Sequence, residues 1–250
     1  MQLRELTAYL DGYLRISEVA DDASALNGLQ VDNSGTVERV AVAVDACQAT
    51  IEAAVQLGAH LLLVHHGLFW GGLQPITGRH ASRIRRLVEA DVAVYSAHLP
   101  LDAHPEVGNN AELARMLGVT DPVPFGEYHE QVIGVAGSLA VPREELVRRL
   151  RDALGGDPHV IATGPDTVQR VGIVTGGGGS MIAQARDAGL DTYVTGEGAH
   201  HTYFDAEEWR LNVIYAGHYL TETVGVKALG RHLEQRFGLP WDFIDHPTGL

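Results

Sequence analysis

An internal repeat constrains the fold more than any single motif does. Short apolar segments alternate with helical segments through the first part of the chain, and the same order returns after residue 170. A shift of 131 residues aligns Val40 with Val171, Ile51 with Ile182 and Gly58 with Gly189, and a shift of 120 residues aligns Leu113 with Leu233 and Gly118 with Gly238. Two ungapped registers that match strand with strand indicate a duplicated α/β unit.

The repeat sets the predicted organisation of the chain. Short strands that alternate with helices are typical of the α/β class, and we expect two related α/β repeats with mixed sheets. The first repeat is predicted over 1–120, a connecting segment over 121–169 and the second repeat over 170–250. Within the second repeat, the pattern predicts a polar stretch after residue 195 and a last helix over 224–237.

Two adjacent histidines follow an apolar run at residues 61–64. The run is short and ends in His65-His66-Gly67, which predicts a strand buried on both faces with histidines at its end. Ligands of α/β proteins usually bind where the strands of a sheet end, and neutral imidazole is the commonest metal ligand. An equally open interpretation of the pair alone is that both histidines bond to the backbone in a structural role.

Two further segments repeat one spacing of ligand-type residues. His98 and Asp102 are separated by three residues, and so are His218 and Glu222. On a helix this spacing places both groups on one face, whereas at a junction of strand and loop the loop has to bring them together. Strand ends that face one cleft would gather these residues with His65 and His66. Paired cations about 3.5–4 Å apart, held by such ligands, activate water for hydrolysis.

Structural alternatives accompany these assignments. Asp102 and Glu222 can instead cap helices or favour their first turns. His200 and His201 are out of register with the first histidine pair, and we expect them to be exposed rather than ligating. The glycines at 176–179 lie between a strand and a helix, where backbone N–H groups can hold phosphate, but a tight turn needed for packing explains them equally well.

Composition narrows the classes of function and the expected location. With 18 basic and 32 acidic residues, the formal net charge is −14, and this disfavours duplex nucleic acid as a partner of the surface. The single cysteine, Cys47, excludes an internal disulfide framework. No signal-like start and no run long enough to span a bilayer is present, so we expect a cytoplasmic protein.

The motifs together resemble one family. The segments 27–31 (NGLQV), 64–70 (VHHGLFW) and 96–102 (SAHLPLD), followed by Thr195-Gly196-Glu197 and the 216–222 segment, are similar to the Nif-three-like dinuclear metal-centre proteins, also called GTP cyclohydrolase I type 2 homologues. The resemblance covers nearly the whole chain. Some members carry an extra domain between the halves, and the roughly 50 residues between the repeats here leave no room for one.

The resemblance implies an intertwined two-repeat fold, a ring-shaped homohexamer and two divalent metal ions per chain. The positions that match the family's ligands are His65, His66, Asp102, His218 and Glu222, whereas His98 and Glu197 are expected to handle protons. Zinc, iron, manganese, nickel and cobalt all suit this ligand set. The implied function is a metal-dependent hydrolase of a small nucleotide-like or phosphorylated substrate. The alternative is a ring-shaped, metal-containing binding or scaffold protein without catalysis.

Overall fold

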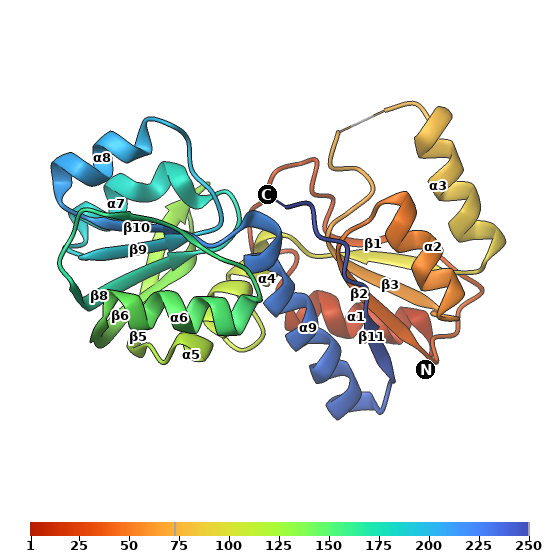
Figure 1. The fold of residues 1–250 in the computed structure, drawn as a ribbon. Helices are drawn as coiled ribbons and strands as arrows, with labels where there is room; N and C mark the ends of the chain where they lie inside the picture. Colours follow the sequence, from red (N-terminus) through yellow and green to blue (C-terminus); the bar gives the residue numbers. More distant parts are fainter. Residues whose placement is uncertain (73, 250) are drawn as a thin grey trace. The chain divides into compact units, whose positions relative to one another are not determined.

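The computed structural model describes residues 1–72 and 74–249, and its elements form two compact units (Figure 1). Unit 1 comprises Met1–Leu101 and Val226–His246, and unit 2 comprises Asp102–Gly225 and the segment after His246. The chain therefore leaves unit 1 after Leu101 and returns to it after Gly225. Each unit contains one mixed sheet with helices, so the predicted α/β class with mixed sheets is confirmed.

Unit 1 is built on a five-stranded sheet of order β1-β4-β3-β2-β11. Its strands are β1 (Gly28–Val31), β2 (Val40–Asp45), β3 (Leu61–His66), β4 (Ala93–Ser96) and β11 (Trp241–Phe243), and its helices include α1 (Leu3–Tyr13), α2 (Gln48–Gln56) and α3 (Gly78–Glu89). Strands β11, β2, β3 and β4 run parallel, and β1 is antiparallel to β4. Nearly every residue of β2 and β3 is buried, as expected for parallel strands covered on both faces.

Unit 2 is built on a six-stranded sheet of order β5-β6-β8-β9-β10-β7. Its strands are β5 (Thr120–Tyr128), β6 (Gln131–Pro142), β7 (His159–Ala162), β8 (Thr167–Val174), β9 (Thr192–Thr195) and β10 (Asn212–Tyr215). Its helices are α5 (Asn109–Leu117), α6 (Arg143–Leu154), the 3-10 turn η1 (Gly178–Met181), α7 (Ile182–Asp187) and α8 (Thr202–Trp209). The apolar sides of α5 and α6 pack on one face of this sheet, whereas α7 and α8 lie on the other (Figure 1).

Two helices cross the boundary between the units. The single-turn helix α4 (Leu99–Asp102) contains the first crossing, and α9 (His218–Phe237) contains the second. The amphipathic pattern predicts α9 only from Val224, but a hydrogen bond from Thr221 N to Gly217 O already closes its first turn. Because α9 begins at His218, the spacing between His218 and Glu222 is a helical one.

The two sheets repeat one arrangement of strands. Strands β2, β3 and β4 are parallel neighbours in unit 1, and β8, β9 and β10 are parallel neighbours in the same order in unit 2. In each sheet an antiparallel strand then flanks the third of them, β1 beside β4 and β7 beside β10. The internal repeat predicted from the two shifts thus reappears as repeated topology.

The remaining differences from the predicted elements concern polar segments. Helix α8 forms in the stretch predicted only to be polar, with Thr202 and Ala206 as its buried positions. The segment predicted to connect the repeats supplies β5, β6 and β7, which belong to the six-stranded sheet of unit 2. No helix among the described residues is both long and apolar enough to cross a membrane.

Candidate metal centre

Unit 1 gathers three histidines at the carboxyl ends of its parallel strands. His65 and His66 end β3, and His98 follows β4. Their ring centroids lie 4.7 Å (His65 to His66), 4.9 Å (His65 to His98) and 5.6 Å (His66 to His98) apart. One ligand nitrogen from each lies within 4.8 Å of the others, a spacing that can hold a metal ion. The structure therefore groups His98 with the two predicted ligands of this unit.

Each of the three histidines is oriented through its Nδ1 atom. His65 Nδ1 donates to the carbonyl of Ala97, His66 Nδ1 to Asp45 and His98 Nδ1 to Asp21, each at 2.9 Å. A carbonyl or an ionised carboxylate only accepts, so the proton resides on Nδ1 and the lone pair of a neutral ring on Nε2. Metal-binding histidines are held in this way, with the second ring nitrogen bonded to a carbonyl or carboxylate.

The buried carboxylate of Asp21 also organises the backbone around His98. It accepts hydrogen bonds from Leu99 N (2.9 Å) and Asn27 Nδ2 (2.8 Å) as well as from His98. Burial raises the pKa of Asp21, but the hydrogen bonds and charge of His98, with those of Asn27 and Leu99, outweigh it and lower the pKa from 3.8. Asp21 thus stays ionised as a fixed acceptor for His98.

Side chains of the 27–31 motif hydrogen-bond to the backbone at His98 and just after His66. Asn27 Oδ1 accepts the backbone N–H of His98 at 2.8 Å, and Gln30 Oε1 accepts that of Leu68 at 2.8 Å. A Cβ at residue 67 would lie 2.2 Å from the amide of Gln30, so a larger residue than Gly67 would displace the amide that bonds Leu68. The sequence contains this motif, but spacing alone gives no indication that its amides support the histidines.

Unit 2 pairs an imidazole with two carboxylates. His218 and Glu222 lie one turn apart at the start of α9, with His218 Nε2 3.1 Å from Glu222 Oε1. His218 Nδ1 lies 3.0 Å from Glu197 Oε1. The hydrogen bond to Glu222, its charge and the contact with Glu197 raise the pKa of His218 to about 9, although burial acts to lower it. Glu222 is 4% exposed and Glu197 is 51% exposed, so the buried carboxylate is the fixed one of the pair.

Asp102 is held in unit 2 by the start of α5. Its Oδ1 atom accepts a hydrogen bond from Asn109 Nδ2 at 2.8 Å and a longer one from Thr175 Oγ1 at 3.3 Å. Asn110 Nδ2 donates to the carbonyl of Asp102, and its Oδ1 accepts Thr175 N. Sequence reasoning missed both asparagines, because a pair of amides at a helix start is otherwise typical of capping.

The glycine run at 176–179 packs against the carboxylate group of unit 2. Gly176 has φ +65°, and a Cβ there would lie 2.2 Å from Glu222 Oε1. At Gly177 a Cβ would lie 3.7 Å from the ring of His218, and at Gly179 it would lie 2.5 Å from Gly198. Close packing therefore accounts for Gly176 and Gly179, as one of the two interpretations left open by the sequence has it, whereas a Cβ at Gly177 would make only an ordinary van der Waals contact.

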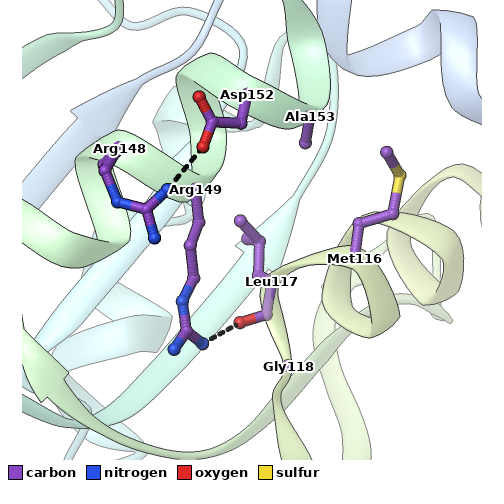
Figure 2. Close-up of a pocket in the computed structure, with 7 residues that line it drawn as sticks. All are labelled: Met116, Leu117, Gly118, Arg148, Arg149, Asp152 and Ala153. Carbon is purple, nitrogen blue, oxygen red and sulfur yellow. Dashed lines mark hydrogen bonds and ion pairs between the residues drawn. The ribbon is translucent and has the colours of Figure 1, made fainter.

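Other histidines and basic residues lie apart from these groups. His200 and His201 are exposed near the start of α8, as predicted. Figure 2 shows a pocket of about 440 Å³ beside α5 and α6 with two arginines in its lining. There Arg148 pairs with Asp152 and with Glu145, and Arg149 donates to the carbonyl of Leu117. Their charges are thus balanced locally, as expected for a solvated face.

A family model described as Duf34/NIF3 (NGG1p interacting factor 3) matches residues 1–248. The chain belongs to the NIF3 family. The resemblance predicted from the motifs is therefore confirmed across essentially the whole sequence.

Individual NIF3 relatives match over nearly all or all of their length. A Deinococcus radiodurans protein named GTP cyclohydrolase 1 type 2 homolog is 47% identical over 98% of this chain and 94% of its own length. A Halobacterium salinarum protein of the same name is 45% identical, with all of both chains covered. Among solved structures, TTHA1606 from Thermus thermophilus has a TM-score of 0.92 and 46% identity, again with both chains covered completely. The NIF3 fold of this chain is thus established along its entire length.

The residue types in both groups of this NIF3 chain suit a divalent transition metal. Imidazole and carboxylate ligands together bind zinc, iron, manganese, nickel and cobalt. In unit 1 the fixed Nδ1 bonds direct the Nε2 lone pairs, and in unit 2 the buried carboxylates of Asp102 and Glu222 are held by the surrounding chain. The chemistry of the donors therefore fits metal ions in both units.

Proposed function

We propose that this NIF3 protein is a dinuclear metal protein that hydrolyses a small nucleotide-like or phosphorylated substrate. His65, His66, Asp102, His218 and Glu222 hold two divalent ions. His98 and Glu197 handle protons beside them, and His98 also has the orientation of a ligand. Relatives named GTP cyclohydrolase 1 type 2 homolog support a nucleotide-related substrate.

The observation that carries this proposal is the common orientation of four histidines. His65, His66 and His98 in unit 1 each bond an oxygen acceptor through Nδ1, and His218 in unit 2 does so with Glu197. Histidines with purely structural roles can hydrogen-bond through either ring nitrogen, so nothing would require all of them to use Nδ1. The three rings of unit 1, each anchored through Nδ1, match the arrangement found around protein-bound metals, and His218 adds a ring that lies between two carboxylates.

A bound pair of ions would supply Lewis acidity and lower the pKa of coordinated water toward neutrality. The protein's own groups then have separate tasks. His98, fixed through Nδ1 by Asp21, can accept or donate a proton only at Nε2. Glu197 is the more exposed carboxylate beside His218 and can exchange protons with solvent. A site that holds positive metal charge also lets a protein of net charge −14 bind an anionic substrate.

Metal content and turnover test the proposal together. Protein purified without chelators or a histidine tag should contain about two transition-metal equivalents per chain, measured by elemental analysis. Asp102→Ala should lose metal, and His65→Ala and Glu222→Gln should abolish hydrolysis of nucleotides and phosphoesters. His200→Ala is the matched control, because His200 is exposed and its ring contacts Phe204 instead. Turnover that survives both His65→Ala and Glu222→Gln would contradict the catalytic function.

The same proposal includes assembly of the chain into a homohexamer. Val123 lies on β5, the edge strand of the six-stranded sheet, and Val132 lies on the neighbouring strand β6; their side chains are 51% and 46% exposed. Apolar side chains at a strand edge favour coverage by another chain. Sedimentation equilibrium measures the assembly directly: a hexamer supports it, and a monomer at all concentrations contradicts it. A metal-loaded hexamer without turnover would instead support the scaffold function.

A further inference from the structure

The indole of Trp70 lies beside two of the histidines in unit 1. Its ring centroid is 5.0 Å from that of His66 and 4.5 Å from that of His98. The turn that follows β3 presents this side chain four residues after His66. Any molecule bound to an ion on these two rings would therefore lie within reach of the indole.

Neither imidazole is stacked parallel to the indole. The interplanar angle is 70° with His98 and 48° with His66, so the two rings approach it edgewise or tilted. Trp70 is 40% exposed, whereas Leu68 in the same turn is 3% exposed. A large aromatic side chain that keeps this much surface beside a polar group offers a flat apolar area for a ligand.

We propose that Trp70 is the stacking platform for a planar heteroaromatic ring of the substrate. This inference rests on the proposed function and specifies the substrate class of that site. An aromatic side chain can stack with nucleobases of any type and with different substituents, because every nucleobase has a π-face. The metals would bind the polar part of the molecule, and Trp70 would fix the plane of its ring.

A cationic ligand is the competing use of an exposed indole, since the face of tryptophan attracts positive charge. Of the two histidines in contact with Trp70, His66 is assigned to the divalent ions and His98 to the proton transfer beside them, and positive ions repel a cation placed there. A neutral or anionic heteroaromatic molecule does not meet this repulsion. The position of Trp70 next to His66 and His98 thus favours a neutral or anionic heteroaromatic ligand over a cationic one.

Two matched probes test the inference on the metal-loaded protein. Guanosine 5′-monophosphate carries a heteroaromatic ring, and ribose 5-phosphate is the same molecule without it. Isothermal titration calorimetry should show that Trp70→Ala weakens binding of the nucleotide about tenfold and leaves ribose 5-phosphate unchanged. Trp70→Phe should retain most of the affinity. Trp209→Phe, whose ring packs under Arg186 in unit 2, is the control for loss of an indole elsewhere.

The possible results separate this inference from the metal centre. Equal weakening of both probes in Trp70→Ala would overturn it, because Trp70 would then support the histidines rather than a ring. Wild-type protein with two metal equivalents that binds the nucleotide no better than ribose 5-phosphate would also overturn it, while the metal centre stands. Loss of metal from wild-type protein would instead contradict the proposed function itself.

Discussion

Three neighbouring parallel strands of one sheet, β2, β3 and β4, correspond to β8, β9 and β10 of the other, yet their carboxyl ends carry different groups. In unit 1, β2 ends in Asp45, which bonds the ring of His66. The matching position after β8 is Gly176, where any side chain would collide with Glu222. Matching positions of the two sheets thus differ: Asp45 supplies a carboxylate, and Gly176 supplies the space for the carboxylate of Glu222.

The two groups also differ in how their histidines are held. In unit 1 each ring bonds one acceptor through Nδ1 and turns its other nitrogen away from it. In unit 2 the ring of His218 lies between two carboxylates, and its pKa rises to about 9. In the proposed metal centre, the rings of the first group already have the orientation that a ligand needs, whereas at His218 a metal ion would have to replace a proton.

The largest expected effect comes from filling the space at Gly176. Gly176→Ala would place a Cβ 2.2 Å from Glu222 Oε1, so the carboxylate must move, and we expect metal affinity to fall on the order of a hundredfold. Gly58→Ala is a close control, because Gly58 has φ +66° but no atom within 4 Å of its added Cβ. It should cost about 1 kcal/mol of stability and leave metal affinity unchanged. Equal metal affinities for the two variants would contradict this account of the glycine.

A second, smaller effect is expected at the two aspartates of unit 1 that hydrogen-bond histidine rings, Asp21 and Asp45. Asp21 is 5% exposed and accepts hydrogen bonds from His98, Leu99, Asn27 and the backbone of Asp22, whereas Asp45 is 36% exposed. An asparagine at 21 has one oxygen for these four donors, so we expect Asp21→Asn to weaken metal binding about ten- to hundredfold. Asp45→Asn should have a smaller effect, because water can replace the lost acceptor. Competition with a chelating dye measures both, and a larger effect from Asp45 would reverse the order proposed here.

The third effect follows from the charge on His218. Its pKa is raised from 6.5 to about 9, so protonated His218 stabilises the metal-free fold fully below pH 6.5, and that contribution is lost as pH rises through about 9. Metal competes with the same proton, so affinity at this residue should rise about tenfold per pH unit below pH 9. Calorimetry in buffers of different ionisation enthalpy should detect about one proton released per chain. Glu222→Gln should lower that number, and an unchanged release would contradict the assignment.

The sequence predicted the strands, and it indicated the candidate ligand residues more readily than the residues that support them. Buried strands such as β3 have continuous apolar runs, and a ligand type at the end of such a run is visible without a structure. The residues that support them, Asp21, Asn27 and Asn109, are not visible in this way. No sequence pattern shows which groups these residues hydrogen-bond in the fold. Helix α9 was predicted too short because polar residues, among them His218, Thr221 and Glu222, interrupt the apolar pattern at its start.

The smallest effect distinguishes the two donors that share one oxygen of Asp102. Asn109 donates to Oδ1 at 2.8 Å, and Thr175 donates to the same atom at 3.3 Å, so the amide makes the stronger bond. Thr175→Val keeps the shape of the side chain and removes only the weaker donor, and we expect it to lower metal affinity about two- to threefold. Asn109→Leu should lower it about tenfold or more, since Asn109 Oδ1 also accepts Gly225 N at the other end of the amide. Metal titrations of both variants decide the order, and a larger loss with Thr175→Val would show that the hydroxyl, rather than the amide, positions this carboxylate.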